Sequence, residues 1–262
     1  MPKRKQLSSQ HLPTLADLFE HNRFAAKGVA AFQAMADGHH FTRLEDERRV
    51  GLYRFSTGTR VRTLFNVRRL KEHGVDRIAD YALSDDGNRM LIAVNRKKLY
   101  RHSYYADFYV FDLGSGRITP LSTRTPQRLA TFSPDGTRVA FVHENDLYVK
   151  EVARNREQRI TRDGRAGCII NGASDWVYDV EFGLTRAFAW SPDSRHLVYL
   201  RFDETKVRQH ELVMYEGADY PRLVRYKYPR AGEANALVHA FIADVRSGRS
   251  VKVDTGRGKD QY

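Results

Sequence analysis

FSPDGTRVAF, at residues 132–141, recurs along the chain in two near copies, LSDDGNRMLI at 83–92 and WSPDSRHLVY at 190–199. Each copy places an apolar residue before a Ser-Pro-Asp-Gly type of turn and an apolar, β-prone run after it. Proline suits the second position of a tight turn, and aspartate and glycine tolerate the next two positions. The aspartates of these turns, together with that of Asp37-Gly38, are spaced 49, 49 and 58 residues apart. The repeat predicts a hairpin that is used four times.

A second hairpin follows each of the first ones. It is present in YRFSTG at 53–58, YVFDLGSG at 109–116 and FIADVRSG at 241–248, whereas LYVKEV at 147–152 turns without a glycine. Two hairpins in a period of about 40–50 residues make a four-stranded sheet, and radial repetition of such sheets is typical of a β-propeller. We therefore predict an all-β fold, a partial β-propeller of about four four-stranded blades. An ordinary β-sandwich with coincidental turns is the alternative.

Three segments depart from the repeat. Residues 1–13 form a basic tail, which precedes a propeller segment over 14–262. Thr14 is a candidate N-cap for a short amphipathic helix over 14–19. The stretch from Phe202 to His239 is too long and too polar for one turn, so it predicts an insertion between the two hairpins of the fourth repeat.

Composition narrows the functional classes. The 262 residues carry a net charge of +12 from 44 basic and 32 acidic side chains, but the basic residues are scattered and no nucleic-acid recognition motif accompanies them. No apolar run reaches the length of about 18 residues that a membrane helix needs. The single cysteine, Cys168, excludes an internal disulfide, and no histidine spacing is typical of zinc. We expect no nucleic acid, metal or cofactor, and we expect Trp190 to lie in the core.

Longer motifs give the chain a family resemblance. NGASDWVYDVEF at 171–182, followed by RAFAWSPD at 186–193, resembles the N-terminal propeller of the dipeptidyl peptidase IV family, within the prolyl oligopeptidase superfamily. YRHSY at 100–104, LRFDE at 200–204 and KYPRAGE at 227–233 occur in the order of that family. The resemblance implies an eight-bladed propeller joined to a C-terminal α/β-hydrolase domain with a Ser, Asp, His triad. It also implies removal of dipeptides from peptide N-termini, typically after proline or alanine.

The same resemblance implies substrate-binding residues. Three acids follow the Asp-Trp-Val-Tyr string in the family, and the last two of them clamp the free α-ammonium of the substrate. In this chain the three positions are Asp179, Val180 and Glu181, so the second acid is replaced by valine. Carboxylates suit an ammonium group that leaves water, because charge-assisted hydrogen bonds replace its hydration. Glu181 is the expected ligand. Asp179 replaces the missing carboxylate only if the backbone turns it to the same side, since residues two apart share a face on a strand but not on a helix.

Arg101 matches the family arginine that projects from the propeller toward a substrate carbonyl oxygen, a task that suits a rigid, permanently charged fork of donors. No Gly-x-Ser-x-Gly nucleophile elbow occurs in the sequence, so the triad is expected in an absent hydrolase domain. We expect a truncated product, a fragment of a longer reading frame or a half that needs a partner, binding peptide substrates with a free N-terminus but inactive alone. The alternative is a non-catalytic propeller that serves as a protein-interaction module, closed by dimerisation or by a smaller blade count.

The N-terminus leaves the localisation open. MPKRKQLSSQHLPTL, at 1–15, has a basic start but lacks the apolar core of a secretory signal. Read literally, the chain stays in the cytoplasm, whereas members of the family are usually secreted, periplasmic or membrane-anchored.

Overall fold

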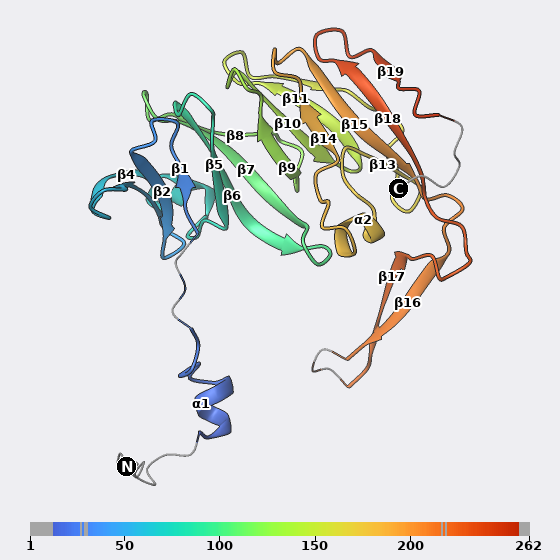
Figure 1. The fold of residues 1–262 in the computed structure, drawn as a ribbon, viewed down its shortest axis with the longest axis horizontal. Helices are drawn as coiled ribbons and strands as arrows, with labels where there is room; N and C mark the ends of the chain where they lie inside the picture. The colour runs from blue at the N-terminus through green and yellow to red at the C-terminus, as the bar shows by residue number, and fades with distance from the viewer. Residues whose placement is uncertain (1–12, 27, 29–30, 216, 218, 257–262) are drawn as a thin grey trace, which may run out of the picture.

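Four antiparallel β-sheets follow one another along an open arc in the computed structural model, which describes residues 13–26, 28, 31–215, 217 and 219–256 (Figure 1). The sheets succeed one another in chain order, from blue at the N-terminal end of the arc to orange and red at its C-terminal end. The predicted all-β fold, a partial β-propeller, is therefore confirmed.

The first three sheets, which we call blades 1 to 3, each contain four strands in chain order. Blade 1 consists of β1 (Gln33–Ala34), β2 (His40–Glu45), β3 (Arg49–Arg54) and β4 (Arg60–Asn66). Blade 2 consists of β5 (Asp80–Leu83), β6 (Arg89–Lys98), β7 (Tyr104–Asp112) and β8 (Ile118–Pro120). Blade 3 consists of β9 (Arg128–Phe132), β10 (Arg138–His143), β11 (Asp146–Glu151) and β12 (Arg156–Arg159). A 3₁₀ helix, η1 (Val67–His73), joins blades 1 and 2.

Blade 4 departs from the expected four strands. It consists of β13 (Ile169–Asn171), β14 (Phe188–Trp190), β15 (His196–Asp203), β18 (Leu237–Asp244) and β19 (Ser250–Lys252). Both β13 and β14 pair with β15, because the segment that holds helix α2 (Trp176–Val180) interrupts the first strand. The predicted insertion is confirmed as a separate hairpin of β16 (Gln209–Met214) and β17 (Arg222–Lys227), which projects from blade 4 (Figure 1).

The repeated turn is held by the serine and the aspartate of its motif. In blade 3, Ser133 Oγ donates to Asp135 Oδ1 (2.5 Å) and accepts from the backbone N–H of Arg138 (3.0 Å), which opens β10. The same two bonds recur with Ser84 in blade 2 and with Ser191 in blade 4. The motif therefore closes each turn with side-chain hydrogen bonds before the strand begins.

Neighbouring turns also contact one another across the blades. The backbone N–H of Asp135 donates to Ser194 Oγ (3.1 Å). Arg89 Nη1 donates to the carbonyl of Gly136 in the next blade (2.9 Å), and Arg138 Nη1 donates to the carbonyl of Ser194 (3.4 Å). Gly136 has a φ of 65° and Ser194, its counterpart in blade 4, a φ of 60°. Each arginine that follows a turn thus fastens its blade to the next one.

The hydrophobic core lies between the blades. One cluster joins blades 1 and 2 and contains Val50 and Ile92. A second joins blades 2 and 3 through Leu91 and Phe141, and a third joins blades 3 and 4 and contains Val142. Because adjacent residues of a strand point to opposite faces, the central strands are buried on both sides.

The N-terminal helix forms as predicted. Helix α1 (Leu15–Phe19) begins after Thr14, whose hydroxyl accepts from the backbone N–H of Asp17 (3.1 Å) while the Asp17 carboxylate accepts from the backbone N–H of Thr14 (3.0 Å). Residues 1–12 of the predicted basic tail lie outside the described residues. Trp190, expected in the core, is partly buried and packs against the third cluster. No helix in the described ranges has the length and apolar character of a membrane span.

Candidate functional site

The loop that carries Arg101 joins β6 to β7, and we call residues 99–103 the Arg101 loop. It is closed by a hydrogen bond from the backbone N–H of Leu99 to the carbonyl of Ser103 (3.0 Å). The Arg101 side chain is exposed, and within the described part of the chain its guanidinium has no hydrogen-bond or ion-pair partner. Strand β7 begins close to α2 (Figure 1), so the loop lies beside that helix.

Helix α2 carries the acidic segment that the sequence singles out. Asp175 caps the helix by accepting from the backbone N–H of Tyr178 (2.9 Å), and Glu181 is the C-cap residue. Successive helical residues are rotated by about 100°. As a result, Asp179 is 0% exposed, Val180 is half-buried and Glu181 is exposed. The Glu181 carboxylate has no partner among the residues that the structure places.

Asp179 joins α2 to the Arg101 loop. Its Oδ1 accepts a hydrogen bond from the backbone N–H of His102 (3.0 Å), across 77 residues of chain. The two predicted ligands Arg101 and Glu181 therefore lie on two segments that this bond connects. Asp179 is on a helix, so its carboxylate points inward, away from the surface that exposes Glu181.

A pocket of about 840 Å³ lies between the Arg101 loop, α2 and the β16–β17 hairpin, and we call it the α2 pocket. Arg101, Trp176 and Val180 line it from the loop and the helix. The hairpin contributes Gln209, Leu212, Val224, Arg225, Tyr226 and Lys227. Val180 thus places an apolar side chain in the wall, whereas Asp179 and Glu181 are not lining residues. Glu181 follows Val180 on the surface, at the C-terminal end of the helix.

The aromatic residues of α2 pack against neighbouring rings. The Trp176 ring stacks on Tyr226 with centroids 5.6 Å apart and meets Tyr228 edge-on at 4.7 Å. Tyr178 is buried and meets Phe202 edge-on at 5.0 Å. These contacts hold α2 between blade 4 and the hairpin.

Glu204, which directly follows β15, lines both the α2 pocket and a second pocket of about 610 Å³. Its side chain is 4% exposed, and burial together with the nearby Asp175 carboxyl raises the pKa of Glu204 to about 7, although Lys227 acts in the opposite direction. Burial likewise raises the pKa of Asp175. On the far side of the second pocket, burial lowers the pKa of the Arg128 guanidinium, which is also 4% exposed.

Sequence reasoning assigned no role to Glu204 or Arg128. Glu204 was part of the LRFDE string, but an acid at the end of a strand is usually solvated, and Arg128 opens a strand among 44 basic residues. Only the packing of three blades shows that both side chains are buried.

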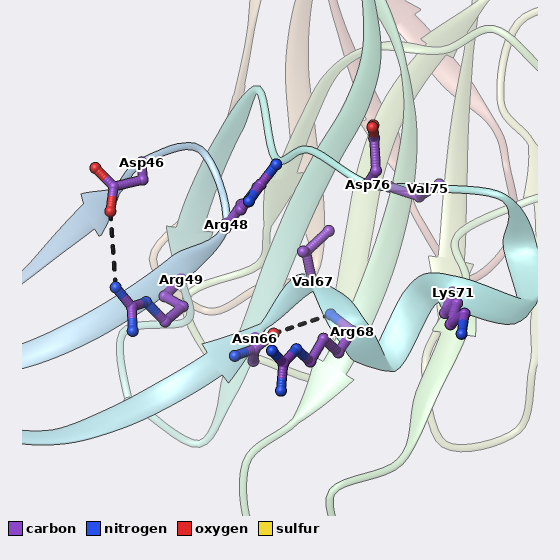
Figure 2. Close-up of a pocket in the computed structure, with 9 residues that line it drawn as sticks. All are labelled: Asp46, Arg48, Arg49, Asn66, Val67, Arg68, Lys71, Val75 and Asp76. Carbon is purple, nitrogen blue, oxygen red and sulfur yellow. Dashed lines mark hydrogen bonds and ion pairs between the residues drawn. The ribbon is translucent and has the colours of Figure 1, made fainter.

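A separate basic pocket of about 430 Å³ lies on blade 1, between β4 and η1. Its cationic side chains are those of Arg48, Arg49, Arg68 and Lys71. Arg49 pairs with Asp46 (3.6 Å), and Figure 2 shows Arg48 and Arg68 extending in opposite directions. The cations do not converge on one ligand group, so this pocket is not a candidate site.

No group of three or more His, Cys, Asp or Glu side chains in the described ranges is arranged to hold a metal ion. Cys168 is a partly buried free thiol. His40, which opens β2, is hydrogen-bonded to Asp37 in the preceding turn (Nδ1 to Oδ2, 2.7 Å).

Comparison with known proteins identifies relatives of this sequence and fold. The family described as "Dipeptidyl peptidase IV (DPP IV) N-terminal region" matches residues 84–262. Dipeptidyl peptidase 4 of Felis catus is 38% identical over 175 residues, and prolyl endopeptidase FAP of Homo sapiens is 31% identical over 215 residues. The crystal structure of Porphyromonas gingivalis dipeptidyl peptidase 4 superposes with a TM-score of 0.89 at 34% identity.

These matches cover most of this chain and a minor part of each relative. The matched shares of this chain are 65%, 81% and 96%, and those of the feline, human and bacterial proteins are 22%, 28% and 36%. The chain therefore spans about a quarter to a third of the length of the relatives that it matches. The family match, the sequence identities and the superposition all indicate the same family. The chain belongs to the dipeptidyl peptidase IV N-terminal region family.

Proposed function

We propose that this chain is the propeller portion of a dipeptidyl-peptidase-IV-like serine exopeptidase and that it recognises the free N-terminus of Xaa-Pro or Xaa-Ala peptides. The observation that carries the proposal is the joining of two segments, since the Arg101 loop and α2 are held together by the bond between His102 and Asp179. Arg101 and Glu181 are both exposed and have no partner in the described part of the chain, so both are free to bind a ligand.

The two side chains suit opposite ends of a dipeptide unit. The Glu181 carboxylate accepts hydrogen bonds from the α-ammonium, and the Arg101 guanidinium donates to a carbonyl oxygen. Val180 offers no acceptor, so the ammonium group has one carboxylate fewer than the family pattern provides. We therefore expect weaker selection for a free amine than in relatives with both acids. The serine nucleophile would come from a hydrolase domain, because these 262 residues contain no Gly-x-Ser-x-Gly motif.

Peptide binding to the purified chain tests this assignment. We expect Ala-Pro peptides to bind more tightly with a free amine than with an acetylated one, and Glu181→Gln to weaken only free-amine binding, by about tenfold or ~1.4 kcal/mol. Glu72→Gln, at an exposed glutamate on η1, is the matched control and should change neither affinity. Equal losses for free and acetylated peptides would remove Glu181 from the site. Release of chromophore from an Ala-Pro reporter by the purified chain would contradict the assignment of catalysis to another domain.

A second candidate function is a non-catalytic protein-interaction module. The β16–β17 hairpin supports it, because the hairpin exposes the apolar side chains of Leu212, Val213, Met214 and Leu223. A dimer that closes over this surface would give a monodisperse particle of twice the chain mass in light scattering. Aggregates, or a monomer at all concentrations, would argue against this second function.

A further inference from the structure

We propose that Asp179 is a positioning residue, not a substrate ligand: its buried carboxylate sets the Arg101 loop against α2. The inference rests on the proposed function, because it concerns how the two substrate-binding side chains are aligned. It replaces the alternative that Asp179 stands in for the carboxylate missing at Val180.

The Asp179 carboxylate forms a buried hydrogen bond that connects α2 to the Arg101 loop, and we call this bond the tie. The side chain is 0% exposed, and Oδ1 accepts from the backbone N–H of His102 (3.0 Å). A substrate ammonium cannot reach a carboxylate with no exposed surface. His102 directly follows Arg101, so the bond fixes the backbone at the residue after the arginine. A hydrogen bond to a charged acceptor is stronger than one between neutral groups, which suits a single long-range tie.

The Asp179 carboxylate has an opposite charge nearby. Its second oxygen, Oδ2, is buried with no hydrogen-bond partner, and so are Nε and Nη2 of Arg128. Arg128 is 4% exposed, and its guanidinium lies over the Tyr105 ring at 5.6 Å. Burial lowers the pKa of Arg128, and the Asp179 carboxyl acts in the opposite direction. A lone buried charge is costly, and no ion pair of 4.0 Å or less joins these two described residues, so Arg128 supplies only a longer-range opposite charge to the Asp179 carboxylate.

These contacts bring three blades to one point. Arg128 opens β9 of blade 3, Asp179 belongs to the α2 segment of blade 4, and His102 lies in the loop of blade 2. The Arg101 loop itself contains one closing bond, from Leu99 to Ser103. Without Asp179, that bond holds the shape of the loop but not its placement against α2. The distance between the Arg101 guanidinium and Glu181 would then vary.

Amide exchange of His102 tests the tie without any ligand. In the wild-type chain, we expect the His102 amide to exchange at least tenfold more slowly than the unbonded amides of the loop. Asp179→Ala should remove that protection, and Asp179→Asn should restore most of it because the amide oxygen still accepts. An unprotected His102 amide in the wild type would overturn the proposal, and this result needs no variant to fold.

A double-mutant cycle tests whether Asp179 acts through Arg101. In the wild type, we expect Arg101→Met to weaken the binding of a free-amine Ala-Pro peptide about tenfold. In the Asp179→Ala chain the same change should cost less than threefold, because the arginine is already misplaced. Equal losses in both backgrounds would show that Asp179 only stabilises the fold and would overturn the proposal. If the wild type binds no peptide, the proposed function fails, while the exchange result still decides the tie.

Discussion

The repeated turns and the α2 region satisfy their polar groups in opposite ways. In the turns of blades 2 to 4, each serine hydroxyl and each aspartate has a near partner, as Ser133 and Asp135 do. The buried side-chain atoms without a partner among the described residues all lie outside these turns. Asn171 Oδ1 is on β13, and the other four are in the Arg101 loop, on α2 and at the start of β9: Ser103 Oγ, Asp179 Oδ2, and Arg128 Nε and Nη2.

This contrast distinguishes the repeated turns, which stabilise the propeller, from the α2 region, which the folded propeller holds in place. Buried polar groups without partners cost free energy, and natural proteins keep few of them. Here they are concentrated where a loop, a helix and a strand from three blades meet. The turns are therefore optimised for folding, whereas the α2 region carries polar groups that folding alone does not require.

The largest expected change in stability comes from replacing a glycine near α2 with alanine, compared with the same replacement in an open turn. Gly172, which precedes α2, has a φ of 74°, and a Cβ there would lie 3.1 Å from Leu147 Cδ1 and 3.4 Å from Phe188 Cδ1. We expect Gly172→Ala to lower the free energy of unfolding by about 3 to 4 kcal/mol, because backbone strain adds to overpacking. Gly58, in the β3–β4 turn, has a φ of 65° and no atom within 4 Å of such a Cβ.

Gly58→Ala is thus the matched control, with backbone strain alone and an expected loss of about 1 kcal/mol. Urea unfolding of the two variants measures the difference. Equal losses would mean that the α2 region yields as readily as an open turn and would remove the contrast between them.

A smaller effect is expected from the buried carboxyl of Glu204. Its pKa is about 7 in the folded chain against 4.5 as the ordinary value, so the folded state holds the proton more tightly. The stabilising contribution of this proton is complete below pH 4.5 and is lost as the pH rises to about 7. Glu204→Gln should therefore raise the free energy of unfolding by about 3 kcal/mol at pH 8 and by less than about 1 kcal/mol at pH 5.

Urea unfolding of the wild type and of Glu204→Gln at the two pH values checks this expectation. Asp175, whose pKa is also raised by burial, is present in both chains, and because its carboxyl contributes to the raised pKa of Glu204 the comparison reports on Glu204 as it interacts with Asp175. A gain that is the same at pH 5 and pH 8 would show that the carboxyl is solvated.

The smallest effect concerns the arginines that link neighbouring turns. Arg89→Met removes the 2.9 Å bond to the Gly136 carbonyl and should cost about 1 kcal/mol. Arg138→Met removes a longer contact, 3.4 Å from the Ser194 carbonyl, and should cost less. Thermal unfolding of both variants gives the order, and a larger loss for Arg138→Met would break the assumed link between bond length and stability.

The sequence predicts the blades well because each depends on local chemistry. A Ser-Pro-Asp-Gly turn and the alternating strand after it are encoded within ten residues, as in 132–141, and the structure contains the expected hairpins. The insertion over 202–239 was recognisable from its length and polarity. The fifth strand of blade 4 was not, because β13 and β14 become separate strands only when α2 leaves the sheet between them.

The site was predictable only in part. Asp-Trp-Val-Tyr and Tyr-Arg-His-Ser-Tyr indicated α2 and the Arg101 loop, and the assignments of Arg101, Glu181 and Asp179 to substrate binding stay predictions. What the chain alone could not provide is the contact between Asp179 and His102, since 77 residues separate them. The burial of Arg128 and Glu204 likewise depends on how three blades pack, a property that no short pattern encodes.

The two-sided burial of the central strands determines what can unfold by itself. Phe141 and Val142, adjacent on β10, belong to different clusters, one shared with blade 2 and one with blade 4. No blade therefore has a hydrophobic core of its own, and the unit that unfolds cooperatively is the interface between two blades. Opening β10 would disrupt two of these interfaces at once, which makes the blades under the site rigid. The β16–β17 hairpin borders neither interface. It can therefore move beside the α2 pocket without opening the contact between two blades.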